Sequence, residues 1–288
     1  MSDLPKISVV VGTRNRVTYL KRLLDGLLRE DYPNMEIVVV DGASTDGTVE
    51  LLKSYGQGAV RWISEPDGGE YFAYNKAIAM ASGEIIKPMC DDDLLRPGAL
   101  KYGAEYFQEN PEVDIVFGRT EFWDVRTGTG EPSKCWPTRQ VEPAQLSLRN
   151  WLRQIEPALM VAAFLRKRVF EQIGRFETKY VCGDVEFLAR AAFRGIKMGV
   201  MPQIVTDYYF TGNNGQVTKW RQIEWDLLAI NRRYGTASDV LHCLRTRIIP
   251  LHVSWVYHNA SWVCHKLGIH PLRFLDRIKS KLAATTRA

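Results

Sequence analysis

Short apolar runs alternate with helical patterns through the N-terminal third of the chain, and this alternation constrains the fold more than any other feature. Residues 7–11, 35–40, 59–64 and 84–90 form apolar runs, most of them rich in β-branched side chains, that are typical of strands. Residues 19–28, 49–55 and 71–81 follow the first three runs with helical spacing or capping residues. The alternation predicts an α/β fold with a doubly wound, mostly parallel sheet covered by helices on both faces.

The remainder of the chain is less regular. We expect helices at residues 99–110, 143–154, 167–173 and 185–194, strands at 113–123, 159–165 and 197–209, and a loop at 126–143, which is rich in Gly, Pro and Thr. A Gly- and Asn-rich link at 212–215 precedes a predicted helix at 216–234. These patterns predict one domain over residues 1–215 and a C-terminal helical, basic extension over 216–288.

Three carboxylates close the fourth predicted strand: Asp91, Asp92 and Asp93. Carboxylates at the end of a buried strand are costly unless a cation compensates them. In an open α/β sheet the carboxyl ends of the strands are also where ligands bind. Mg²⁺ and Mn²⁺ prefer carboxylate and phosphate oxygens, so the triplet predicts a divalent metal that holds a diphosphate. The alternative is a solvated acidic turn, because Asp favours turns and helix caps.

The other early strands also end in polar side chains. Thr13, Arg14, Asn15 and Arg16 follow the first run, Asp41 follows the second, and Glu65 and Asp67 follow the third. Because the carboxyl ends of parallel strands share one edge of a sheet, these groups outline one crevice. A nucleoside diphosphate suits the crevice, since Asp41 can accept a hydrogen bond from a base and the arginines can pair with phosphates. Thr13 or Asn15 as a cap of the following helix is the alternative.

Composition narrows the class of protein. The chain is 45% hydrophobic and 25% charged, which is ordinary for a globular protein. Its five scattered cysteines show neither metal-ligand spacing nor an even disulfide set, which favours a reducing compartment. The N-terminus leads into a strand without a signal-peptide pattern, and no apolar run reaches the length of about 18 residues that a spanning helix needs. We therefore expect a cytoplasmic protein.

Basic charge and histidines gather at the C-terminus. From Val240 onward there are eight Lys and Arg against one acid, Asp276, and all five histidines lie there as well. The body of the chain has no imidazole, so a general base there is expected to be a carboxylate. Ile248, Leu251, Trp255 and Trp262 share one helical face, which favours contact with the inner, anionic face of the plasma membrane. The alternative is a helix that packs on the body of the protein and leaves its cations solvated. Nucleic-acid binding is not expected, because no nucleic-acid module is present.

Five blocks of sequence, met in order, resemble the inverting GT-A glycosyltransferases of family 2. They are residues 9–16, 31–48, 64–76, 81–86 before the aspartate triplet, and 170–177 with 183–190 downstream. The resemblance covers roughly residues 5–210. It implies a GT-A fold and an enzyme that moves a sugar from a nucleotide-sugar, most often a UDP-sugar, to a hydroxyl of a glycan or lipid-linked acceptor with inversion. It also implies a role in building cell-surface polysaccharide.

The resemblance assigns roles to individual residues. Asp93 and Asp91 match the positions that hold Mn²⁺ or Mg²⁺, and Asp184 matches the catalytic base. The matches along the donor are Thr13, Arg14 and Asn15 with the adjacent Arg16 in a first nucleotide loop, Asp41 at the base, Asp67, Asn75 and Lys76 in a second loop, and Asp92 within the triplet. Asp184 is also expected to be the N-cap of the helix that follows it.

The sequence departs from the family pattern at two places. Phe72 and Ala77 stand where relatives often carry Asp and Gly, and the stretch 157–163 lacks the His or Gln often seen on the acceptor side. Two other functions remain open. A sugar-nucleotide pyrophosphorylase would use Gly12-Thr13-Arg14 as a phosphate loop, although that loop normally holds more glycine. A catalytically silent nucleotide-sugar-binding subunit would keep the donor site without turnover.

Overall fold

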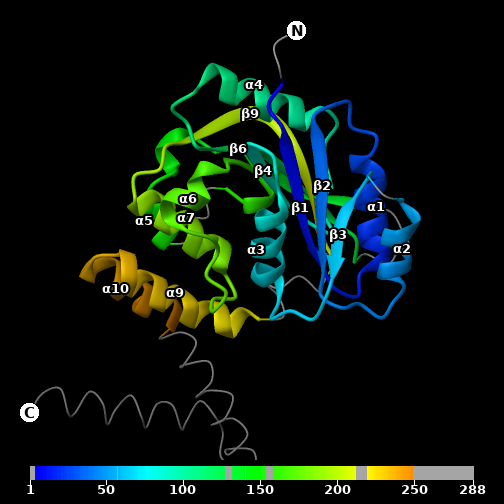
Figure 1. The fold of residues 1–288 in the computed structure, drawn as a ribbon. Helices are drawn as coiled ribbons and strands as arrows, with labels where there is room; N and C mark the ends of the chain where they lie inside the picture. The colour runs from blue at the N-terminus through cyan, green and yellow to red at the C-terminus, as the bar shows by residue number, and fades with distance from the viewer. Residues whose placement is uncertain are drawn as a thin grey trace, which may run out of the picture.

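The computed structural model describes residues 4–56, 58–126, 132–139, 141–153, 158–211 and 219–248. Within these ranges nine strands form one sheet in the order β3-β2-β1-β4-β8-β6-β9-β5, with β7 paired to β6 (Figure 1). The strands are β1 (Ile7–Thr13), β2 (Met35–Asp41), β3 (Arg61–Ser64), β4 (Ile85–Cys90), β5 (Leu94–Leu95), β6 (Ile115–Asp124), β7 (Ser133–Arg139), β8 (Ala163–Arg166) and β9 (Met198–Phe210). The α/β fold class predicted from the sequence is confirmed.

The N-terminal part of the sheet is parallel. β1 pairs in parallel with β2 and with β4, and β2 pairs in parallel with β3. The intervening helices are α1 (Val17–Leu27), α2 (Thr48–Ser54) and α3 (Glu70–Met80), and α4 (Ala99–Glu109) follows β5. All four of these predicted strands and all four helices lie within two residues of their expected bounds. The parallel pairing brings the carboxyl ends of β1, β2, β3 and β4 to one edge, as the sequence predicts.

The sheet is mixed beyond β4. β8 runs antiparallel to β4 and to β6, whereas β9 runs parallel to β6 and antiparallel to β5. Three local predictions are wrong. The helix expected at 143–154 is divided into a 3₁₀ turn, η1 (Pro143–Gln145), and a separate helix, α5 (Leu148–Leu152). The expected loop at 126–143 contains β7, which pairs with β6 across a bulged register. The strand expected at 159–165 begins as a 3₁₀ turn, η2 (Met160–Ala162), before β8.

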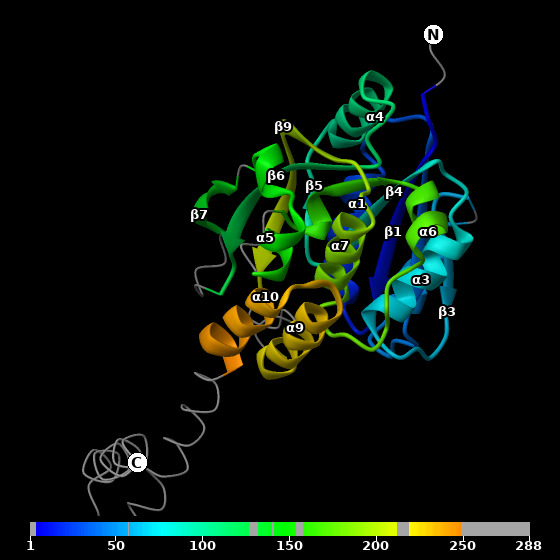
Figure 2. The ribbon, with the colours of Figure 1, turned by 90° about the vertical axis from the view of Figure 1, so that its left-hand side faces the viewer.

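Helices cover both faces of the sheet (Figure 2). On one face Val10 and Val38 pack in a core with residues of α3, α5 (Leu148–Leu152), α6 (Arg168–Ile173), α7 (Gly183–Phe193) and α9 (Trp220–Tyr234). On the other face Val9 and Val39 pack with residues of α1 and α4. Successive strand residues thus enter opposite cores, which explains why the early strands are apolar at every position.

The C-terminal elements that the structure describes pack on the body. Leu227, Leu228 and Ile230 of α9 are buried in the core that α7 shares. α10 (Ala237–Cys243), η1 (Pro143–Gln145) and η3 (Leu244–Ile248) complete the described elements. None of the described helices has the length and apolar character needed to cross a membrane. The predicted tail residues Leu251, Trp255 and Trp262 lie outside the described residues.

Candidate functional site

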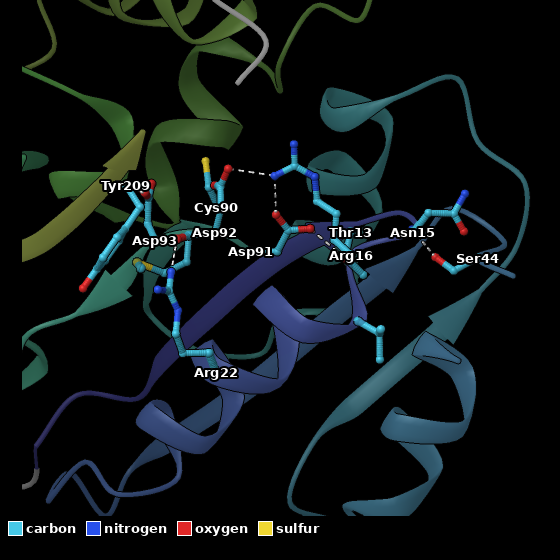
Figure 3. Close-up of polar contacts among 12 residues, drawn as sticks. Thr13, Asn15, Arg16, Arg22, Ser44, Cys90, Asp91, Asp92, Asp93 and Tyr209 are labelled. Carbon is cyan, nitrogen blue, oxygen red and sulfur yellow. Dashed lines mark hydrogen bonds and ion pairs between the residues drawn. The ribbon is translucent and has the colours of Figure 1, made fainter. Parts of the chain in front are cut away.

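The carboxylate of Asp91 binds the loop that follows β1. The Thr13 hydroxyl donates to Asp91 Oδ2 at 2.7 Å, and the Arg16 guanidinium lies 3.2 Å from Asp91 Oδ1 and 2.7 Å from Asp92 Oδ2 (Figure 3). Burial raises the pKa of Asp91 to about 6, although Arg16 acts in the opposite direction. Residues predicted from two different strand ends therefore form one connected cluster: Thr13 and Arg16 follow β1, and Asp91 and Asp92 follow β4.

Asp93 carries an oxygen without a partner. Its Oδ1 accepts from the backbone N–H of Tyr209 at 3.0 Å, whereas Oδ2 is buried and has no hydrogen-bond partner among the described residues. Burial, and then the neighbouring charge of Asp92, raise the pKa of Asp93 well above its ordinary value. A buried carboxylate oxygen of this kind is stabilised by a cation.

The atoms around the Asp93 carboxylate fit a divalent metal. One ligand atom each from Cys90, Asp92 and Asp93 lies within 4.8 Å of the others. The two carboxylates match the preference of Mg²⁺ and Mn²⁺ for oxygen. The thiol of Cys90 does not, because sulfur is a soft ligand that suits other metals. The pair of metal ligands predicted from the sequence, Asp93 with Asp91, stays a prediction. Arg16 engages both Asp91 and Asp92, and the ligand atoms that lie close together in the structure add Asp92 to Asp93 as a candidate.

Two cations that sequence reasoning did not select support the triplet. Arg22 of α1 donates to the backbone carbonyl of Asp92, and its guanidinium lies 4.1 Å from the centroid of the Tyr209 ring (Figure 3). Lys87 of β4 is fully buried and donates to the backbone carbonyl of Val161. Burial lowers the pKa of Lys87 to about 7, although Cys90 and Asp93 favour its charged form. A lysine inside an otherwise apolar strand was a signal in the sequence that could have revealed this second cation.

The loops after β1 and β2 are tied to each other. The Asn15 backbone N–H donates to Ser44 Oγ at 2.7 Å, and the Thr45 N–H donates to Asn15 Oδ1 at 2.8 Å. Asn15 adopts a left-handed conformation with φ 52°, which asparagine tolerates better than most residues. The side chain of Asn15 thus fixes the path of the second loop rather than capping α1 as the alternative proposed, since the N-cap of α1 is Arg16.

Asp41 organises the loop that follows β2. It is fully buried, and its carboxylate accepts from the Ser44 N–H at 3.0 Å and from the hydroxyls of Ser44 and Ser64. Next to it in the chain, Gly42 is approached by Arg14 and Asp67. A Cβ at that glycine would lie 3.2 Å from Arg14 Cδ and 3.3 Å from Asp67 Oδ1. The structure therefore brings Arg14, Asp41 and Asp67 together.

The other two predicted donor residues on α3 make local contacts. Asn75 exchanges two hydrogen bonds with the backbone of Phe176, at 2.8 and 3.0 Å. Lys76 pairs with Glu65 at 2.8 Å. Phe72, which departs from the family pattern, is 40% exposed and packs against Gly68. Asn75 thus joins α3 to the segment before α7.

Asp184 lies in the first turn of α7. The Tyr71 hydroxyl of α3 donates to Asp184 Oδ1 at 2.9 Å. Burial raises the pKa of Asp184, while hydrogen bonds from Tyr71 and from the Val185 N–H lower it in part. The expectation that Asp184 is the N-cap is wrong, because Cys182 occupies that position. Gly183 is required for the contact, since a Cβ there would lie 2.8 Å from the Tyr71 ring.

Comparison with known proteins identifies the family. A family model described as glycosyl transferase family 2 matches residues 8–174. The chain belongs to this family. A glycosyltransferase of Haloferax volcanii, AglE, is 28% identical over 257 residues, which is 83% of this chain and 81% of the relative. The uncharacterized glycosyltransferase Rv1514c of Mycobacterium tuberculosis is 29% identical over 195 residues, which is 67% of this chain and 71% of the relative.

Solved structures agree on the fold. TarS 1–349 of S. aureus in complex with UDP-GlcNAc aligns with a TM-score of 0.61 and 19% identity, covering 83% of this chain and 69% of TarS 1–349. The mannosyltransferase PcManGT of Pyrobaculum calidifontis, in complex with GDP-Man and Mn²⁺, aligns with a TM-score of 0.62 and 21% identity. It covers 98% of this chain and 81% of the mannosyltransferase. The predicted GT-A fold and the predicted enzyme class, a glycosyltransferase, are both confirmed.

Glu70 is a further carboxylate of this glycosyltransferase that sequence reasoning missed. It is the first residue of α3, one position before Tyr71, and its side chain is exposed to solvent. The following residue, Tyr71, donates a hydrogen bond to Asp184. Glu70 therefore begins α3 beside the contact that holds Asp184. No motif in the sequence distinguished it from an ordinary acidic residue at a helix start.

Proposed function

We propose that the protein transfers a sugar from a nucleoside diphosphate sugar to a hydroxyl of a glycan or lipid-linked acceptor, with inversion and with Mn²⁺ or Mg²⁺, in the synthesis of a cell-surface polysaccharide. The observation that carries the proposal is the buried Asp93 oxygen that has no hydrogen-bond partner in the described part of the chain, together with the nearby Asp92 and an oriented Asp184. UDP-GlcNAc bound to TarS and GDP-Man with Mn²⁺ bound to PcManGT support a nucleotide-sugar donor and a divalent metal.

The chemistry is a displacement at the anomeric carbon of the donor sugar. Asp184 accepts the proton of the acceptor hydroxyl, whose oxygen forms the new bond while the bond from the anomeric carbon to the phosphate oxygen breaks. Its raised pKa improves Asp184 as a base near neutral pH, and Tyr71 holds the accepting oxygen in place. A cation held by Asp92 and Asp93 would stabilise the charge that develops on the diphosphate.

The nucleotide side of the crevice uses the loops after β1, β2 and β3. Asp41 matches the family position that contacts the base, and Asp67 and Arg14 lie beside it across Gly42. We propose uracil as the base, because that is the base this position usually contacts in the family. Arg14 is expected to pair with phosphate, since Arg16 is already bound to Asp91 and Asp92.

The proposed function is tested by measuring the Tm of the protein with UDP, GDP and dTDP, each with and without Mn²⁺. We expect a Mn²⁺-dependent rise in Tm with UDP and a smaller one with the other two. Slow Mn²⁺-dependent hydrolysis of a UDP-sugar is expected in the same samples. Stabilisation without hydrolysis of any sugar nucleotide would favour the silent subunit, and formation of a sugar nucleotide from a sugar phosphate would favour the pyrophosphorylase. No stabilisation by any nucleotide would refute the donor site.

The place of action is part of the proposal. We propose that the chain works at the inner face of the plasma membrane, where lipid-linked acceptors are available, and that its basic C-terminal segment attracts anionic lipids. Arg245 and Arg247 in η3 begin that segment, and most of its basic residues follow beyond residue 248.

A further inference from the structure

Three aromatic rings gather at the ends of β6 and β9. Tyr208 lies opposite Phe122 in the strand register, and their ring centroids are 5.8 Å apart. Phe210 stacks on Phe122 at 6.3 Å and meets Tyr208 edge-on at 5.0 Å. Tyr208 and Phe210 are each partly exposed, whereas Phe122 is 8% exposed and lies beneath them. The proposed transfer mechanism uses none of these rings.

Side chains alternate along β9, and this alternation places the Tyr208 and Phe210 rings on the side of the sheet that carries the reaction site. Tyr209, between them, donates its N–H to Asp93 and turns its ring to Arg22 of α1. Tyr208 and Phe210 therefore face the opposite side of the sheet, where α3 and α7 pack. Burial, and then the charges of Asp93, Cys90, Asp92 and Asp184, raise the pKa of Tyr208, in agreement with this placement.

The sheet order places the rings away from the nucleotide. The nucleotide loops follow β1 and β2, which lie on one side of β4, whereas β6 and β9 lie on the other side, beyond β8. A donor whose diphosphate lies at the end of β4 therefore has its nucleotide on the β1 side. The acceptor must approach Asp184 from the remaining side, which is the side of β6 and β9.

We propose that Tyr208 and Phe210 form a platform that binds the pyranose ring of an acceptor sugar. The proposal rests on the proposed function and names part of its acceptor site. The C–H faces of a sugar ring carry partial positive charge and stack on the negative faces of aromatic rings. A cation beside the rings favours a neutral sugar: the Arg126 guanidinium, 6.0 Å from the Phe210 centroid, is already paired with Asp124 by bonds of 2.9 and 2.6 Å.

The experiment uses the full chain with UDP and Mn²⁺ and a panel of methyl glycosides of glucose, galactose, mannose and N-acetylglucosamine. Saturation-transfer NMR reports contact between aromatic protons of the protein and ring protons of each glycoside. We expect at least one glycoside to give a signal that falls about fivefold in both Phe210→Ala and Tyr208→Leu, in line with the loss of one stacked ring. Phe193→Ala is the matched control, because Phe193 is 55% exposed on α7.

The outcomes distinguish failure of the aromatic platform from failure of the proposed transferase function on which it rests. If UDP binds with Mn²⁺ but no glycoside gives a signal, or the signal persists in Phe210→Ala and Tyr208→Leu, the platform is refuted and the donor site stands. If UDP itself does not bind, the proposed function fails first. Tyr208→Leu keeps an apolar side chain of moderate size, so it preserves the test if Phe210→Ala does not fold.

Discussion

Asp93 is the residue whose substitution should most reduce the dependence on a metal. Its Oδ2 has no partner among the described residues, so the Asp93→Asn variant loses a charge that only a cation would have balanced. We expect the Mn²⁺-dependent rise in Tm to vanish and turnover to fall by about a hundredfold or more, the scale of a lost transition-state charge contact. Calorimetric titration with Mn²⁺ and a donor hydrolysis assay measure the two effects.

The matched control for Asp93 is Asp25→Asn. Asp25 is a surface carboxylate paired with Lys21 on α1, so its loss should leave metal binding and turnover unchanged. Undiminished activity of wild-type protein in EDTA, or of Asp93→Asn in Mn²⁺, would contradict the metal role.

The Tyr71 hydroxyl is expected to act through Asp184. Its hydrogen bond lowers the pKa of Asp184 against the opposing effect of burial, so the Tyr71→Phe variant should raise that pKa further. The base must be deprotonated to work, and the acid limb of the pH–rate profile should therefore move to higher pH. We expect kcat at neutral pH to fall about tenfold, the scale of one hydrogen bond to a charged group, with UDP affinity unchanged.

Tyr74→Phe serves as the comparison for Tyr71. The Tyr74 hydroxyl donates to the backbone carbonyl of Met89 at 2.8 Å, so its loss should lower stability but leave the pH profile in place. An unshifted acid limb in Tyr71→Phe would show that the hydroxyl only supports packing.

The sequence predicted a site residue where the residue stands at the end of a recognisable strand. It did not predict a role that depends on a contact with a residue far away in the chain. The sequence placed Thr13, Asp41 and the triplet at one sheet edge because parallel strands share that edge. It gave no sign that Thr13 would bind Asp91 or that Arg16 would bind both Asp91 and Asp92, since side-chain direction at the end of a strand depends on neighbours more than 70 residues away. The Tyr71–Asp184 bond spans 113 residues and left no local pattern.

At the scale of elements, a single carboxylate at the start of β2 joins three parts of the sheet. Glu36 accepts from the Ser8 hydroxyl of β1, from the backbone and hydroxyl of Ser82 before β4, and pairs with Lys6. Burial alone would raise the pKa of Glu36, but these hydrogen bonds outweigh it and hold the pKa at about 2. Because the folded-state pKa lies below the unfolded value, the stabilisation is present above about pH 4.5 and is lost as pH falls towards 2.

The Glu36→Gln variant tests this linkage. We expect it to lower the free energy of unfolding by about 1–3 kcal/mol at pH 7. The difference from wild type should shrink between pH 5 and 3. Urea unfolding at both ends of that range measures it, and Glu109→Gln, at the end of α4, is a surface comparison. A difference that is constant with pH would mean that Glu36 contributes by packing alone.

The elements themselves were predictable in proportion to their periodicity. β1, β2 and α1 follow from unbroken apolar runs and from leucines at helical spacing, which tertiary contacts reinforce rather than override. β7 was missed because Ser133–Arg139 lacks alternation and includes Pro137, and its pairing with β6 depends on bulges. The antiparallel β8 was found as a strand, but its direction follows from the path of the chain and not from any local signal.

At the scale of the whole molecule, α9 is part of the body. Asp226 accepts from the Val181 N–H at 2.6 Å, Asn231 donates to the Leu152 carbonyl at 3.0 Å, and Tyr234 donates to the buried Glu186. Together with the apolar residues that α9 adds to the core, these contacts link it to α5 and α7. A shortened chain that ends before α9 would expose that core, so any separable function of the C-terminus must reside beyond the described elements.

Removal of residues 249–288 is therefore the truncation that separates membrane binding from catalysis. It takes away most of the C-terminal basic charge while leaving α9 and α10 in place. We expect the shortened protein to keep its Mn²⁺-dependent stabilisation by UDP and to lose co-sedimentation with vesicles containing anionic phosphatidylglycerol. The full chain should bind those vesicles but not vesicles of neutral phosphatidylcholine. Its binding should weaken as the salt concentration rises, because screening weakens the attraction of basic segments to anionic lipid. Equal binding by both proteins would assign the membrane contact to the body, and no binding by the full chain would refute the membrane proposal while leaving the donor site intact.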